Sequence, residues 1–81
     1  MVKNTSKRIV SDPRILGGKP IVRGTRISVE YILELLHSGM SIEDILKEYK
    51  HLSGADLRDA IAFAKKSVAR QQSVPIKLSY A

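Results

Sequence analysis

The chain has 81 residues, of which 43% are hydrophobic and 27% are charged. A chain of this length buries only about 60% of its unfolded surface, so it has room for one small domain. It contains no cysteine, which excludes a disulfide framework, a cysteine nucleophile and a thiolate metal site. The net charge of +6 favours an acidic partner, either nucleic acid or an acidic protein.

The apolar runs of the chain are short. Residues 1–10 are basic but lack the apolar stretch of about seven residues that a signal peptide requires. No run approaches the roughly 18 apolar residues of a membrane helix. We therefore expect no membrane span and a cytoplasmic location, and the absence of cysteine suits a reducing compartment.

Charge and turn-forming residues divide the chain into three parts. Residues 1–27 form a basic arm with seven Lys and Arg against one Asp, and they contain most of the glycines and prolines. Residues 28–70 have helical periodicity, and residues 71–81 form a tail that contains Pro75. We expect the arm to form short strands, with Arg23-Gly24 at the tip of a hairpin that pairs Ile21-Val22 with Arg26-Ile27.

Two glycines, Gly17 and Gly18, precede Lys19 in a pattern that invites comparison with a phosphate-binding loop. A nucleotide loop needs a longer glycine-bearing turn, with Lys followed by Ser or Thr at the start of a helix, whereas Lys19 is followed by Pro20. We interpret the segment as a tight turn with positive φ at one or both glycines.

Apolar residues spaced i, i+3, i+4 and i+7 predict three helices, the third ending near Arg70. Each helix is preceded by a candidate N-cap serine, namely Ser28, Ser41 and Ser53. Gly39 stands where the first helix needs a left-handed C-cap. The pattern indicates a mainly α, three-helix domain of the helix-turn-helix kind with an N-terminal β-arm, in which the second and third helices form the motif pair.

No group of residues indicates catalysis. His37 and His51 are far apart and have no carboxylate at metal-site spacing, so we predict no metal and no cofactor. The sequence indicates no general base and no oxyanion site for any of the three serines. Helix N-capping explains them better. The sequence therefore does not predict an enzyme.

Basic residues give the main functional signal. The candidate DNA contacts of the arm are Arg8, Arg14, Lys19, Arg23 and Arg26. Arg58 at the start of the third helix is a further candidate, but we expect Asp56 and Asp59 to be exposed beside it and to repel phosphates. The arm would then make most of the contacts. The alternative is that these cations form a solvated surface that serves solubility.

The tail and the small core both point to protein partners. Apolar residues alternate with other residues along the tail at Val74, Ile76, Leu78 and Tyr80. This alternation suits a strand added to the sheet of a partner or of a sister subunit, although a frayed tail remains the alternative. We also expect a homodimer, because so small a core is marginal alone.

Residues from Ile9 to about Ala64 resemble the family known as domain of unknown function 433. The resemblance is carried by the string GGKP at 17–20, the string RGTRI at 23–27 and the helical string at 42–49. It implies a winged or homeodomain-like helix-turn-helix domain and an antitoxin that binds its own operator and neutralises a PIN-like ribonuclease. Ser28 and His51 stand where relatives commonly have proline. A protein-interaction module that does not bind DNA is the alternative function.

Overall fold

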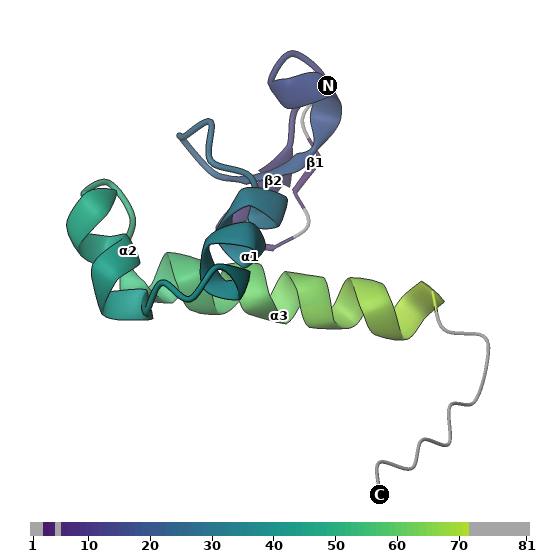
Figure 1. Ribbon diagram of the computed structural model, residues 1–81. Coiled ribbons are helices and arrows are strands. Elements are labelled where there is room, and N and C mark those ends of the chain that lie inside the picture. Colours follow the sequence, from purple (N-terminus) through teal and green to yellow (C-terminus); the bar gives the residue numbers. More distant parts are fainter. Residues whose placement is uncertain (1–2, 5, 72–81) are drawn as a thin grey trace, which may run out of the picture.

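The computed structural model describes residues 3–4 and 6–71 of the chain and shows a small antiparallel sheet set against three helices (Figure 1). The elements in order are β1 (Lys3–Asn4), β2 (Ile9–Ser11), the 3-10 turn η1 (Leu16–Gly18), β3 (Pro20–Val22), α1 (Val29–His37), α2 (Ile42–Glu48) and α3 (Gly54–Gln71). The expected class, mainly helical with an N-terminal hairpin, is confirmed. The tail residues Val74, Ile76, Leu78 and Tyr80 lie outside the described residues.

The sheet has the order β1-β2-β3, and both pairings are antiparallel. Ile9 pairs with Val22 and Val10 pairs with Ile21, so β-branched side chains face one another across the ladder. The expected pairing of Ile21-Val22 with Arg26-Ile27 is confirmed in part, one residue out of register. Ile21 forms an antiparallel bridge with Ser28, and the Val22 N–H donates to the Ile27 carbonyl at 2.9 Å. The main partner of Ile21-Val22 in the sheet is β2, which the sequence did not predict.

The helix ends have the predicted caps. The Oγ atom of Ser28 accepts the Tyr31 N–H at 2.9 Å, and that of Ser41 accepts the Asp44 N–H at 3.1 Å. Ser53 and Asp56 form a reciprocal capping box, with side chain to amide distances of 2.9 and 3.2 Å. These serines are structural, as predicted.

The first helix ends in a paired C-terminal motif. Gly39 has a φ of 103°, a region that L side chains rarely adopt. Its N–H donates to the Leu36 carbonyl, and the Met40 N–H donates to the Leu35 carbonyl. These two bonds satisfy carbonyls that the helix end would otherwise leave without partners.

The core lies where the sheet, α1, α2 and α3 meet. Its innermost side chains are Ile9, Ile32, Ile45 and Leu57, each at most 1% exposed. Figure 1 shows α1 lying across α3, with α2 at the N-terminal end of α3 and the sheet on the other side of α1. Burial of these residues fixes which face of α3 turns outward. Within residues 3–4 and 6–71, no helix combines the length and the apolar character needed to span a bilayer.

Candidate nucleic-acid interface

Arg8 is engaged inside the chain by the start of α3. Its Nε lies 3.3 Å from Oδ1 of Asp56, and its terminal nitrogen lies 3.8 Å from Oδ2 of Asp59. The expectation that Asp56 and Asp59 are exposed beside Arg58 and repel phosphates was therefore wrong, since both carboxylates are partly buried and pair with Arg8. The two acids turn toward the sheet because Arg8, at the end of the β1–β2 connection, reaches them there.

Arg14 is bound to Asp12 on its own turn. The carboxylate of Asp12 accepts the Arg14 backbone N–H at 2.9 Å and two guanidinium N–H groups at 3.0 and 2.9 Å. Hydrogen bonds from Arg14 lower the pKa of Asp12 from its ordinary value of 3.8 to about 2. Asp12 itself is buried, so this pair anchors the turn that leads into η1.

Two more arm cations also have partners. The Nζ of Lys19 lies 2.7 Å from Oε1 of Glu30, and this bond lowers the pKa of that carboxyl. The Nε of Arg23 donates to the Lys7 carbonyl at 3.1 Å. Of the five candidate DNA contacts on the arm, only Arg26 makes no ion pair or hydrogen bond through its side chain in the described part of the chain.

Arg58 belongs to an outward face of α3. Leu57 and Ala60 point into the core, at 1% and 0% exposed, whereas Arg58, Ala62 and Lys65 are exposed at helical spacing. The acids of α3, Asp56 and Asp59, are turned to Arg8 instead. This surface, the outward face of α3, therefore presents the cations Arg58 and Lys65, small alanine side chains, and the exposed apolar residues Ile61 and Val68.

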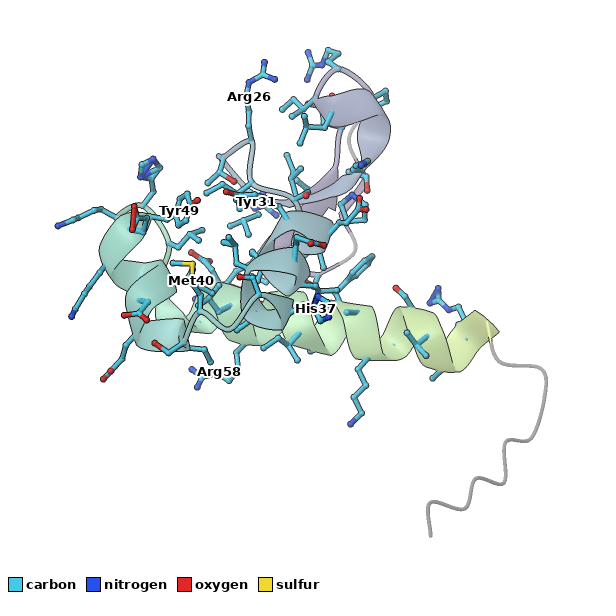
Figure 2. All side chains as sticks on the ribbon, in the orientation of Figure 1. Arg26, Tyr31, His37, Met40, Tyr49 and Arg58 are labelled. Atoms are coloured by element: carbon cyan, nitrogen blue, oxygen red, sulfur yellow. The ribbon has the colours of Figure 1, made fainter. Side chains whose placement is uncertain are left out.

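The six candidate DNA contacts do not form one surface. Figure 2 shows Arg26 and Arg58 pointing away from opposite sides of the molecule. Arg8 lies between the sheet and α3, and Arg14 sits on its own turn. An interface with DNA thus has two separate starting points, the loop around Arg26 and the outward face of α3.

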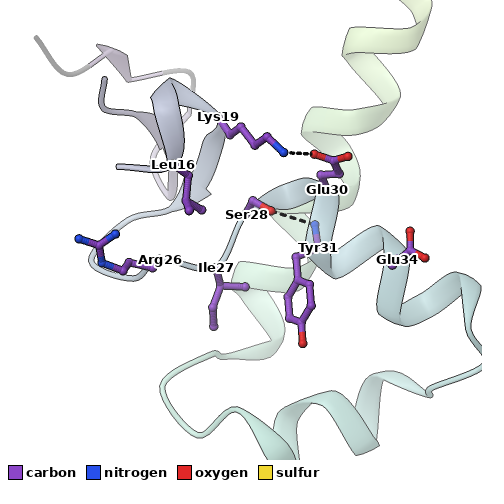
Figure 3. Close-up of a pocket in the computed structure, with 8 residues that line it drawn as sticks. All are labelled: Leu16, Lys19, Arg26, Ile27, Ser28, Glu30, Tyr31 and Glu34. Atoms are coloured by element: carbon purple, nitrogen blue, oxygen red, sulfur yellow. Dashed lines mark hydrogen bonds and ion pairs between the residues drawn. The ribbon is translucent and has the colours of Figure 1, made fainter. Parts of the chain in front are cut away.

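Beside Arg26 lies a hollow of about 520 Å³ between η1 and α1, shown in Figure 3. Its lining residues are Leu16, Lys19, Arg26, Ile27, Ser28, Glu30, Tyr31 and Glu34. Leu16, Ile27 and Tyr31 give it an apolar floor, and Arg26 and Glu34 stand at opposite ends. We refer to this feature as the η1–α1 hollow. Sequence reasoning missed it because it forms only when η1 is placed beside α1, which local patterns do not specify.

Leu16 is the unusual residue of the hollow. Its φ is 50°, in the left-handed region, where a bulky side chain costs roughly 1 to 2 kcal/mol. Gly17 and Gly18 continue the same left-handed turn, with φ of 65° and 89°, which confirms the prediction for the two glycines. The Leu16 side chain is nevertheless 43% exposed, so core burial does not explain the strained backbone.

Tyr31 joins the hollow to α2. Its hydroxyl lies 2.6 Å from the hydroxyl of Tyr49, and the two rings meet edge to face with centroids 6.0 Å apart. This hydrogen bond raises the pKa of Tyr49.

A second hollow, of about 650 Å³, lies on the other side of Arg26 and Ile27 and is also lined by His51. From the sequence, His51 is expected to have a surface role or to interact with the terminal carbonyls of a helix. Among the residues that the structure describes, no three His, Asp or Glu side chains gather as a metal site would require. The arrangement offers cationic and apolar contact surfaces.

Comparison with known proteins shows which family this three-helix domain with its small sheet belongs to. The profile of the family described as "Protein of unknown function (DUF433)" matches residues 9–64, and the chain belongs to this family. A crystal structure of a DUF433 member from Anabaena variabilis ATCC 29413 superposes with a TM-score of 0.75 at 25% identity, over 80% of this chain and 64% of that one.

A relative in sequence is the uncharacterized protein y4eO of Sinorhizobium fredii (strain NBRC 101917 / NGR234). It is 36% identical over 62 residues, which cover 76% of this chain and 28% of the relative. The chain thus spans about a quarter of the length of that relative and just under two thirds of the Anabaena chain. The family resemblance expected from the GGKP and RGTRI strings is confirmed.

Proposed function

We propose that this protein is a DNA-binding antitoxin of a prokaryotic toxin-antitoxin pair, in which α3 acts as the recognition helix of a helix-turn-helix domain. The observation that carries the proposal is the outward face of α3. It presents Arg58 and Lys65 to solvent, while Arg8 holds the two acids of α3 on another side.

Charge geometry supports contact between α3 and phosphates. Carboxylates aimed at DNA would repel it, but Asp56 is only 16% exposed through its side chain and is neutralised by Arg8. Small side chains such as Ala62 let a helix approach a groove closely, and flanking cations bind phosphates. Four of the five arm candidates are engaged within the chain, so the proposal gives α3 the larger share of the contacts.

A binding experiment tests this part. The full chain is titrated against duplex DNA from upstream of its own gene across a salt series. We expect log affinity to fall by about 0.9 per phosphate contact for each unit of log salt. Arg58→Ala should reduce that slope by about one contact per chain and weaken binding.

Arg14→Ala is the matched control, because it removes the same charge from a side chain that is bound to Asp12 on a separate turn. It should leave the salt slope unchanged. A flat salt response in the wild-type protein would refute DNA binding. An unchanged slope in Arg58→Ala would instead remove α3 from the interface.

The neutralised partner in this proposal is a PIN-like ribonuclease, which the family resemblance implies. We expect this nuclease to be encoded by the reading frame next to the gene of the present chain. The product of that frame should cleave RNA alone and lose this activity when the present chain is added in equimolar amount. Unchanged cleavage would refute the antitoxin function, whatever the outcome with DNA.

The second candidate function is a protein-interaction module that does not bind DNA. The observation that favours it is the η1–α1 hollow, where Leu16, Ile27 and Tyr31 form an apolar surface open to solvent. Such surfaces on small proteins commonly mark contacts with other proteins. The flat salt response described above would favour this candidate.

A further inference from the structure

The two ends of the η1–α1 hollow carry opposite charges. The guanidinium of Arg26 stands at one end and the carboxylate of Glu34 at the other, with Leu16, Ile27 and Tyr31 between them (Figure 3). Neither Arg26 nor Glu34 makes an ion pair within residues 6–71, whereas Lys19 and Glu30 on the rim satisfy each other at 2.7 Å. The hollow therefore offers one available charge of each sign, separated by an apolar floor.

This pattern is self-complementary. In a two-fold interface the same patch meets itself, so a residue at one end contacts the residue at the other end of the partner copy. Rotation about an axis through the apolar floor brings Arg26 of one chain to Glu34 of the other, and the reverse pair forms at the same time. An acidic ligand would instead satisfy Arg26 and be repelled by Glu34.

We propose that the η1–α1 hollow is the interface at which two copies of this chain associate. Two symmetric Arg26–Glu34 ion pairs then flank an apolar centre made by Leu16, Ile27 and Tyr31 of both copies. The inference goes beyond the proposed function, since it does not depend on DNA or on a nuclease. It leaves Arg58 on the outward face of α3 uncovered, because Arg58 points away from the side that carries Arg26.

The strained turn at Leu16 also supports a second copy of the chain as the partner at the hollow. Three bonds hold the turn, from the N–H groups of Ile15, Gly18 and Lys19 to carbonyls of the same segment. They keep Leu16 at a φ of 50° with its side chain 43% exposed at the hollow. Strained residues of this kind collect at contact sites, where the strain positions a side chain for a partner. In the proposed dimer Leu16 becomes buried against the second copy.

Charge reversal gives a sharp test by sedimentation equilibrium of the full chain. The wild type is expected to be a dimer. Arg26→Glu alone places like charges opposite each other twice, and so does Glu34→Arg alone. Each should weaken dimerisation at least about tenfold. The double variant Arg26→Glu/Glu34→Arg restores both pairs with reversed polarity and should recover most of the wild-type affinity. Lys47→Glu, at an exposed cation of α2 that does not line the hollow, is the control with the same change of charge and should stay dimeric.

Leu16→Gly separates an interface role from a structural one. Glycine relieves the left-handed strain, so at concentrations low enough to keep both proteins monomeric the Leu16→Gly chain should unfold at the same temperature as the wild type or higher. The dimer should weaken, because the anchor side chain is gone. A residue that matters only to the fold would not show this combination.

Several results would overturn the interface. A wild-type chain that stays monomeric at its highest soluble concentration would do so. A dimer that survives Arg26→Glu, Glu34→Arg and Leu16→Gly would show that another surface, such as residues 72–81, joins the copies. A double variant no tighter than either single variant would exclude the Arg26–Glu34 pairing.

Discussion

The guanidinium of Arg8 lies 3.3 Å from the carboxylate of Asp56, which ties the arm to the first turn of α3. Asp56 serves two purposes at once, since its other oxygen accepts the Ser53 N–H at 2.9 Å and caps the helix. The position of the helix start and the position of the sheet are therefore coupled through one carboxylate. The same contact removes negative charge from the surface proposed for DNA.

Arg8→Ala should destabilise the fold, because it leaves Asp56 half-buried without its cation. A double-mutant cycle with Asp56→Asn, which keeps an acceptor for the cap, isolates the ion pair. We expect a coupling of about 0.5 to 1 kcal/mol that shrinks in high salt, measured by urea denaturation. Additive effects of the two substitutions would mean that the pair contributes nothing to stability.

The Asp12–Arg14 contact predicts that the free energy of unfolding falls at acid pH, which we call the acid limb of the pH profile of stability. The pKa of Asp12 is lowered from 3.8 to about 2 in the folded chain, so folding favours the ionised carboxyl. The resulting stability is fully present above about pH 4 and is lost as the pH falls through 2. Asp12→Asn should remove this part of the dependence between pH 4 and 2. Glu43→Gln, at an exposed acid of α2, is the control and should keep the wild-type acid limb. If Asp12→Asn shows the wild-type slope, other carboxyl groups dominate acid unfolding.

Replacing either of two glycines at helix ends by alanine should change the stability of the fold, in opposite directions at the two positions. Gly39 has a φ of 103°, so Gly39→Ala forces a strained backbone and should cost roughly 1 kcal/mol. Gly54 begins α3 without a positive φ, and nothing lies within 4 Å of the position that an alanine methyl group would take there. Gly54→Ala should therefore stabilise the fold by about 0.4 to 1 kcal/mol. Thermal unfolding of both variants checks the pair. Equal effects would contradict the assigned backbone geometry.

The local features of this chain could be predicted from the sequence because the information lies within a few residues. Ser28, Ser41 and Ser53 each stand directly before apolar residues at helical spacing, and each accepts the amide three residues on. Gly39 ends α1 and the glycines after Leu16 adopt positive φ for the same local reason. These signals gave the three helices and the turn.

The wrong predictions all involve contacts between distant residues. Nothing near Ile21 shows that its strand pairs with Val10 in β2 as well as bridging Ser28 after the turn. The pairing of Arg8 with Asp56 needs the sheet and α3 to be placed first, so charge counts along the chain misjudged which acids face solvent. The η1–α1 hollow was missed because it depends on how η1 and α1 are placed relative to each other, although an apolar Leu16 in a glycine-rich turn was a visible sign of an exposed contact.

The hydroxyls of Tyr31 and Tyr49 give a prediction at alkaline pH. Their hydrogen bond, 2.6 Å long, raises the pKa of Tyr49, so folding favours the protonated phenol. This stability is present below the pKa of an unfolded tyrosine, near 10, and is lost as the pH rises through the higher folded value. Tyr31→Phe removes the partner, so it should lower the pKa of Tyr49 and flatten the alkaline loss of stability. Ultraviolet absorbance of the phenolate follows the titration, and Tyr80→Phe removes the tyrosine outside the described residues from the signal. If Tyr49 titrates at the same pH with and without the Tyr31 hydroxyl, the contact between α1 and α2 does not hold in solution.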